Sequence, residues 1–276
     1  MSKSMTLKRH RMVKPKNCFT GLILFLLVLS CSGVNNNADV TEKSSGISNE
    51  NTDPLFANSI VSTNIDFITE NDEDSFVNIT YLGQYDKEMP DSRNDMLFDT
   101  NTYVFQANFS LGTSVEIWAH SDFESEATAK SFVDKLAGPL GKLPTLMRNK
   151  LSHVVLHKGD AGAFAEAEAN FFVVYSDNID LRISNNDFEE TVFHESVHAS
   201  LDSDYLNSTE WLSAQQNDKT FITQYAKENS DKEDLAESAL FVYTILKHPG
   251  RLSSNTENWV KQHIPNRLKF IVALFE

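Results

Sequence analysis

The sequence predicts an α+β domain in which a small mixed sheet with an N-terminal hairpin packs on a helical half. Apolar residues alternate with polar ones between residues 103 and 119, the period-two pattern of half-buried strands. Two short apolar runs, at 154–157 and 171–175, are typical of buried strands. From residue 187 onward the apolar residues recur at helical spacing. Strands followed by helices along the chain favour the α+β class.

The predicted hairpin comes first among these elements. One strand covers 103–109, with three aromatic residues and Ala107 on one face, and a second strand covers 115–119. Leu111-Gly112-Thr113 offers a turn between them. A hairpin is therefore expected at the start of the sheet.

Helices follow the hairpin and then fill the second half of the chain. Phe123–Leu136 has the apolar spacing of an amphipathic helix, and the glycines and proline at 138–141 interrupt the pattern after it. Pro144 is placed to open a short helix through Met147. The later helices are expected at about 187–201, 207–225 and 231–247, followed by a C-terminal pair divided at Pro265.

Residues 1–30 have the organisation of an export signal. Six basic residues and no acidic one accompany an apolar run at 21–29, which is short for a transmembrane helix. The run ends in Val28-Leu29-Ser30-Cys31, which resembles a bacterial lipobox; a plain secretory signal or a signal anchor has similar features. The resemblance implies cleavage before Cys31, a lipid on that cysteine and attachment to the bacterial cell envelope. Ser32 is similar to the residue that follows the cysteine in outer-membrane lipoproteins.

The composition changes after the signal. Residues 31–55 are rich in Asn, Ser, Thr and Glu and predict a flexible tether, whereas 56–276 predict one folded domain. The chain has 24 basic and 39 acidic residues, and removal of the six basic residues of the signal leaves 18, a formal charge of −21. Such acidity argues against nucleic-acid binding and against membrane attachment through a basic patch. If cleavage precedes Cys31, Cys18 leaves with the signal and Cys31 carries the lipid, so no thiol remains for a disulfide and the fold must rely on its core or on a metal.

The helix predicted over Asp187–Leu201 carries the main chemical signal. His194 and His198 are four residues apart, so a helix places both imidazoles on one face, at a spacing that suits two ligands of one zinc ion. Glu195 then flanks the metal, where a carboxylate can take a proton from water and pass it to a leaving amine. Asp187 and Glu190 have the spacing of a capping box at the start of this helix.

A catalytic zinc site needs a third protein ligand and one open position, and three carboxylates are candidates. Asp204 lies six residues after His198, but Leu201 stands where a tight turn would be required to bring it back. Asp202 is four residues after His198, at the end of the same helix. Glu233, near the start of the next long helix, is favoured.

Glu233 is favoured as the third ligand because of its spacing from Glu237. The two carboxylates are four residues apart on an otherwise apolar helix, where they repel each other unless a cation lies nearby. With Glu233 as a ligand, Glu237 can accept a hydrogen bond from a ligand imidazole and fix its tautomer. Ser230 and Glu233 also have capping-box spacing, which is the simpler explanation of Glu233.

The succession of three motifs resembles a known group of enzymes. His194-Glu195-x-x-His198, Tyr225-Ala226-x-x-Asn229 and Glu233-Asp234-x-Ala236-Glu237 are similar to the gluzincin-type HExxH zinc metallopeptidases related to the anthrax lethal factor catalytic domain. The resemblance implies a zincin-like fold and one zinc ion held by His194, His198 and Glu233. It also implies that Tyr225 points at the substrate oxyanion.

The function expected from these residues is zinc-dependent hydrolysis of peptide bonds, with Glu195 as general base and a peptide or protein as substrate. The strand at 171–175 is a candidate to pair with an extended peptide, although an apolar run of this kind is also typical of a buried strand. Two other functions remain open. One is a non-catalytic zinc-containing surface lipoprotein that binds a partner, and the other is a hydrolase of non-peptide amides such as those of a cell wall.

Overall fold

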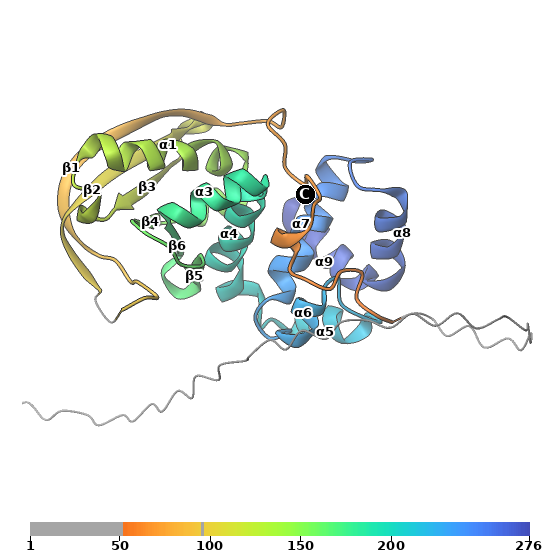
Figure 1. Ribbon diagram of the computed structural model, residues 1–276. Coiled ribbons are helices and arrows are strands. Elements are labelled where there is room, and N and C mark those ends of the chain that lie inside the picture. Colours follow the sequence, from red (N-terminus) through yellow and green to blue (C-terminus); the bar gives the residue numbers. More distant parts are fainter. Residues whose placement is uncertain (1–51, 95–96) are drawn as a thin grey trace, which may run out of the picture. The chain divides into compact units, whose positions relative to one another are not determined.

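The computed structural model describes residues 52–94 and 97–276 (Figure 1). The signal expected at 1–30, the expected lipidation site Cys31 and nearly all of the tether expected at 31–55 lie outside these residues. Within the described ranges, none of the helices combines the length and the apolar character needed to cross a bilayer.

The first half of the described chain builds one mixed sheet of six strands in the order β1-β2-β3-β4-β6-β5. Antiparallel pairs join β1 to β2, β2 to β3 and β5 to β6, whereas β3–β4 and β4–β6 are parallel. The strands are β1 (Phe76–Glu88), β2 (Phe98–Phe109), β3 (Ser114–Ala119), β4 (His153–His157), β5 (Phe164–Glu166) and β6 (Phe171–Tyr175).

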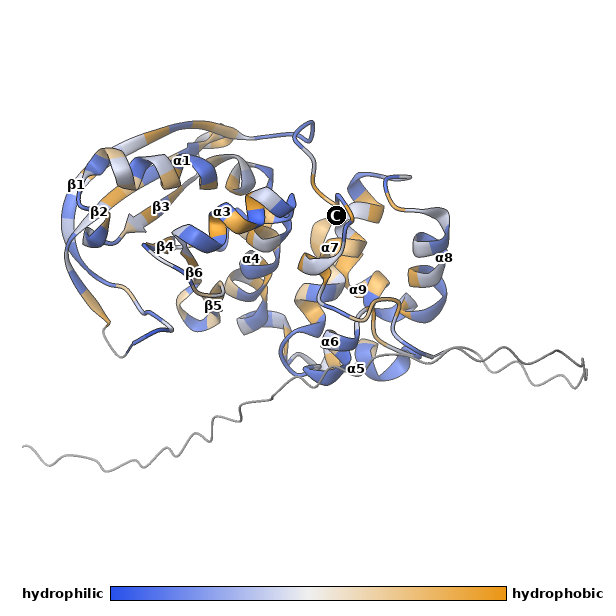
Figure 2. Ribbon diagram, viewed as in Figure 1, coloured by the Kyte–Doolittle hydropathy of each residue, from blue (hydrophilic) through white to orange (hydrophobic). Residues whose placement is uncertain are grey.

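The helices follow in two groups, one beside the sheet and one in the C-terminal half (Figure 1). The longer helices beside the sheet contribute apolar residues to the core, and Figure 2 colours these parts of their ribbons orange. The helices are α1 (Glu126–Lys142), α2 (Thr145–Lys150), α3 (Ser176–Asn185), α4 (Phe188–Tyr205), α5 (Thr209–Asn217), α6 (Gln224–Glu228), α7 (Asp234–Lys247), α8 (Ser254–His263) and α9 (Pro265–Phe275).

The mixed α+β class and the hairpin are confirmed. Strands β2 and β3 pair with Tyr103 opposite Ala119 and Ala107 opposite Val115. The turn contains Leu111 at φ 67° and Gly112 at φ 78°, so the chain reverses through two left-handed residues. Strand β1 is not predicted from the sequence, because this long edge strand is mostly exposed and its register shifts interrupt the alternation of apolar and polar residues.

The predicted helices at 123–136 and 207–225 differ from the structure. Helix α1 continues through Pro139 to Lys142 instead of ending near residue 136. Its last turn is buried, and a Cβ at Gly141 would lie 1.9 Å from Asp74 Oδ1, so only glycine fits there. The helix expected at 207–225 is divided into α5 and α6, because the connecting segment pairs with a distant part of the chain at Phe56.

The predicted break at Pro265 is confirmed, since this residue occupies the first turn of α9, where its missing N–H costs no hydrogen bond. Trp211 of α5 is fully buried in the core.

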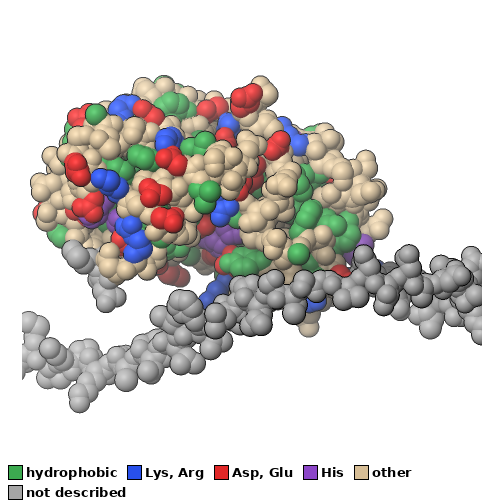
Figure 3. All heavy atoms as spheres, viewed as in Figure 1, with side chains coloured by type: hydrophobic (Ala, Val, Ile, Leu, Met, Phe, Trp, Pro, Cys, Tyr) green, Lys and Arg blue, Asp and Glu red, His purple; other side chains and the backbone are tan. Residues whose placement is uncertain are grey.

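Figure 3 shows Lys and Arg side chains dispersed among Asp and Glu on the face in view. Charge on that face of the described residues is therefore mixed.

Candidate metal centre

Helix α4 is the element on which the site is built. It packs against β5 and β6 of the sheet and against α7 of the C-terminal half. His194 and Glu195 are buried on this helix, and His198, one turn after His194, is partly exposed. Because α4 is enclosed by neighbours on several sides, the direction of its imidazoles is fixed by packing.

The start of α4 differs from the predicted capping box. Asp187 is the N-cap residue but makes no side-chain cap bond, and its carboxylate pairs with Arg182 at 3.1 Å. The Glu190 carboxylate instead accepts hydrogen bonds from the backbone N–H groups of Phe67 and Ile68, both at 3.1 Å. Tertiary contacts therefore replace the local bonds that the spacing suggested.

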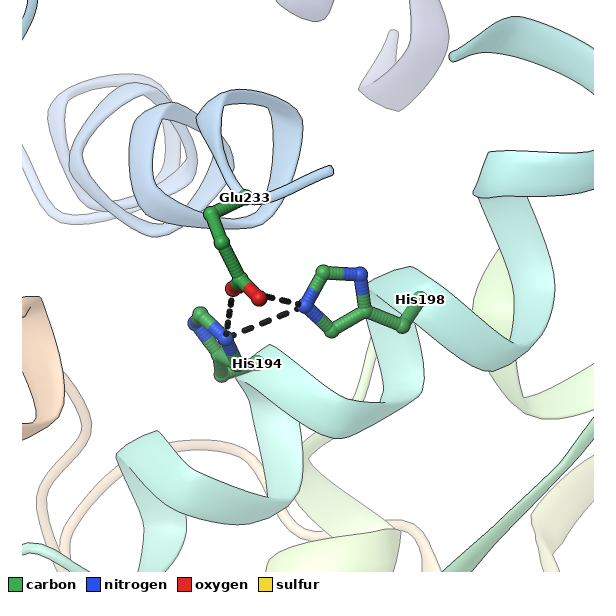
Figure 4. A group of neighbouring side chains, drawn as sticks. All are labelled: His194, His198 and Glu233. Carbon is green, nitrogen blue, oxygen red and sulfur yellow. Dashed lines mark hydrogen bonds and ion pairs between the residues drawn. The ribbon is translucent and has the colours of Figure 1, made fainter. Parts of the chain in front are cut away.

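Glu233 lies at the N-cap of α7, so the predicted start of this helix near residue 231 is too early. Its side chain makes no cap bond, so the structure does not support the alternative explanation of Glu233 as part of a capping box. The Glu233 carboxylate reaches from the start of α7 to the two imidazoles that project from α4 (Figure 4).

One potential ligand atom from each of the three side chains lies at a corner of a nearly equilateral triangle. His194 Nε2 and His198 Nε2 are 3.1 Å apart, and Glu233 Oε2 is 3.3 Å from each. Ligand atoms about 2.0–2.1 Å from one tetrahedral zinc ion would stand about 3.3 Å apart. Two imidazoles and one carboxylate therefore fit three corners of such a site, and this group can hold a metal ion. No other group of this kind occurs among the described residues.

A carboxylate lies behind each imidazole. Asp202 Oδ2 is 2.7 Å from His198 Nδ1, so this residue, one of the candidate third ligands, contacts the opposite ring nitrogen. Glu237 Oε1 is 3.7 Å from His194 Nδ1, which is longer than a hydrogen bond. Asp204, the other candidate, is exposed and pairs with Lys150, away from the imidazoles.

Glu195 is 9 % exposed and lies among the charged groups of the site. Burial raises the pKa of its carboxyl group; the charges of His194 and His198 oppose this effect, and the negative charge of Glu233 adds to it, so that the pKa stays raised. A carboxylate with a raised pKa is closer to the proton affinity that a general base needs near neutral pH.

Tyr225 is brought to the same site by α6. Burial raises the pKa of its hydroxyl, and the charge of Glu233 and a hydrogen bond to it add to this effect. The side chain remains 37 % exposed. A neutral phenol beside the carboxylate ligand is thus available as a hydrogen-bond donor near solvent.

The site favours positive charge. Burial lowers the pKa of His198, but hydrogen bonds to Asp202 and Glu233 outweigh it and raise this pKa to about 10. For Glu233 burial raises the pKa, and hydrogen bonds from His194 and His198 bring it well below the ordinary range. The carboxylates around the imidazoles therefore favour a cation at this position, and a divalent metal would supply one when bound.

A buried ion network fixes the start of α7 next to Glu233. Arg267 of α9 donates to Asp234 at 2.7 Å and to Asp218 at 3.0 Å, and the three side chains are fully buried. Gln215 also donates to Asp234 at 2.9 Å. The network connects α5, α7 and α9, and sequence spacing alone gave no indication of it.

Comparison of the chain with protein-family models, with curated proteins and with solved structures finds no match.

Proposed function

We propose that this protein is a zinc-dependent peptidase in which His194, His198 and Glu233 hold the metal. The observation that carries the proposal is the triangle of ligand atoms, with sides of 3.1–3.3 Å, beside a buried Glu195. The donor set of two imidazoles and one carboxylate suits zinc and is typical of catalytic sites, which keep one position open. A purely structural site would favour a fourth protein ligand and would have no use for Glu195.

Zinc bound there would supply a Lewis acid that polarises a carbonyl group and lowers the pKa of water. Glu195 accepts a proton from the attacking water and delivers it to the leaving amine, so that the amide nitrogen departs as a neutral group. Tyr225 donates a hydrogen bond to the carbonyl oxygen of the substrate as negative charge develops on it, which stabilises the transition state more than the bound substrate.

Strand β6, the expected substrate-binding strand, has no unpaired edge to offer a peptide. Strand β6 (Phe171–Tyr175) is buried and interior, with β4 on one side and β5 on the other. Strand β5 ends the sheet order, and α4 packs against it. We therefore propose that the extended peptide binds along the outer edge of β5, which pairs with no other strand among the described residues and where backbone hydrogen bonds can hold a peptide regardless of its sequence.

The lipobox-like signal supports a location at the cell envelope. A lipid on Cys31 would hold the enzyme at the membrane surface, and the tether expected at 31–55 would let the catalytic domain reach peptide or protein substrates nearby. The excess of acidic residues favours this form of attachment over binding to anionic lipid head groups.

The experiment begins with metal analysis of the purified full chain, followed by incubation with a mixed peptide library with and without chelator. We expect about one zinc per chain and cleavage that the chelator abolishes. Glu195→Gln should keep zinc and lose roughly 10²–10⁴-fold in rate. Glu189→Gln is the matched control, because Glu189 lies on the same helix but pairs with Lys142 at 3.3 Å.

Three outcomes would contradict the proposal: no bound metal, retained cleavage in Glu195→Gln, or an equal loss in the control. Cleavage of cell-wall amides without cleavage of any peptide would assign the same machinery to non-peptide substrates. Zinc binding without hydrolysis of either class would favour the non-catalytic lipoprotein.

A further inference from the structure

A segment at the start of the described chain crosses both helices that carry the candidate ligands. We call residues 55–68 the N-terminal strap; Figure 1 shows it in orange, passing α6 and α7. Phe56 begins it by pairing with the segment before α6, donating to Ile222 O at 3.1 Å and accepting from Gln224 N at 2.8 Å. The strap is thus tied to the chain immediately before Tyr225.

On α7 the strap binds Glu237, one turn after the ligand Glu233. Ser59 Oγ donates to Glu237 Oε1 at 2.5 Å, and the backbone N–H of Ile60 donates to Oε2 at 2.9 Å. Thr223 Oγ1 adds a third bond, to Oε2, at 2.8 Å. Glu237 is fully buried, so these donors hold its carboxylate in one orientation.

On α4 the strap binds Glu190, one turn before the ligand His194. Both backbone donors, Phe67 N and Ile68 N, lie at 3.1 Å from Glu190 Oε1, and the residue is 2 % exposed. The strap therefore contacts a buried carboxylate on each ligand-bearing helix, four residues from a ligand in both cases.

The two imidazoles differ in what lies behind them. His198 Nδ1 has Asp202 at 2.7 Å, whereas His194 Nδ1 is buried without a hydrogen-bond partner and faces Glu237 Oε1 at 3.7 Å. An unpaired buried donor is costly, and metal-bound histidines usually donate their second N–H to a carboxylate. Glu237 Oε1 has two lone pairs, so it can accept from His194 while it accepts from Ser59.

We propose that Ser59 is a positioning residue of the metal centre: its hydroxyl holds the Glu237 carboxylate that orients His194, and the affinity for metal therefore depends on a residue outside both ligand helices. This inference rests on the proposed metal site and not on hydrolysis. Partners of ligating side chains typically contribute 10–100-fold to metal affinity. Because Ser59 acts through Glu237, we expect an effect of about tenfold, at the lower end of that range.

The test compares the zinc dissociation constants of the full chain and its Ser59 variants, measured by competition with a chromophoric chelator. Ser59→Ala should weaken zinc binding about tenfold, and Ser59→Thr, which keeps the hydroxyl, should restore it. Thr63→Ala is the matched control, because Thr63 Oγ1 donates to Ile60 O at 2.8 Å within the same strap but does not touch Glu237. The visible spectrum of the Co²⁺-loaded protein should change in Ser59→Ala only, since it reports on ligand geometry.

Equal zinc affinity in the wild type and Ser59→Ala would overturn the inference, and so would an equal loss in Thr63→Ala. If the wild type binds and hydrolyses but Ser59→Ala is unchanged in both affinity and spectrum, this inference alone fails. If Ser59→Ala weakens zinc binding as expected but no substrate is cleaved, the proposed function fails and the positioning role stands. A wild type that binds no zinc overturns both.

Discussion

Replacement of Arg267 by Met tests the buried network behind the start of α7. The guanidinium donates to Asp218, Asp234 and the carbonyl of Thr220, and the side chains of the arginine and both aspartates are 0 % exposed. Methionine has a similar length and no charge, so the variant keeps much of the packing and removes the cation. Two carboxylates are then left in the interior without their positive partner.

The expected cost follows from this burial. Removing one partner of a buried ion pair typically destabilises a protein by about 3–5 kcal/mol. Gln215 still donates to Asp234, and the backbone and side chain of Asn266 still donate to Asp218, so both carboxylates keep some donors. We therefore expect the lower end of the range, about 3 kcal/mol. Burial already raises the pKa of Asp234, and loss of the arginine should raise it further.

The assay is urea denaturation of the full chain with chelator present, so that metal binding does not contribute to the free energy of unfolding. The control is Arg251→Met, because Arg251 also pairs with a carboxylate, Asp72, but is 22 % exposed. We expect the control to cost about 1 kcal/mol or less. A loss below about 1 kcal/mol in Arg267→Met, or one no larger than in the control, would refute the argument from buried charge. If Arg267→Met does not fold, adding Asp234→Asn should recover part of the stability.

Two further predictions concern the metal and pH. Glu233→Ala should strongly lower the zinc content of the purified chain, whereas Asp204→Ala should not, since Asp204 is exposed and paired with Lys150; the opposite order in metal analysis would point to a different third ligand. Burial raises the pKa of Glu190 from 4.5 to about 7, so the folded state binds its proton more tightly than the unfolded state. The free energy of unfolding of the metal-free protein should therefore fall by up to about 3 kcal/mol as pH rises from 4.5 through 7. Glu190→Gln, which keeps a hydrogen-bond acceptor, should remove this part of the pH dependence. Identical pH profiles of the wild type and the variant would contradict the prediction.

The local parts of the site were accessible from sequence because helical geometry fixes them. His194 and His198 at a separation of four must share a face of α4, and Glu195 must flank them. The choice of Glu233 used a different signal, a second carboxylate four residues away on an apolar helix. The structure brings Glu233 together with the two imidazoles, as expected, but the contact depends on how α7 packs on α4.

The tertiary parts of the site could not be derived in this way. Asp202 was considered as a metal ligand because it follows His198 by four residues, but the helix places it on Nδ1, facing away from the triangle. Ser59 carries no sequence signal, and the capping-box spacing of Glu190 does not indicate its actual partners, because the partners of both residues are distant in the chain. Pro139 was misleading for a related reason: its propensity to end a helix is weaker than the burial of the turn around it.

The break between α5 and α6 has a consequence for local unfolding. Helices α5 and α6 are separated by a six-residue link, residues 218–223. This link contacts both the N-terminal and the C-terminal parts of the described chain. Phe56 hydrogen-bonds to the C-terminal end of this link, and Arg267 hydrogen-bonds to its N-terminal end. Local opening of residues 218–223 would therefore release Phe56 and Arg267 together and would disturb α6, the helix that carries Tyr225.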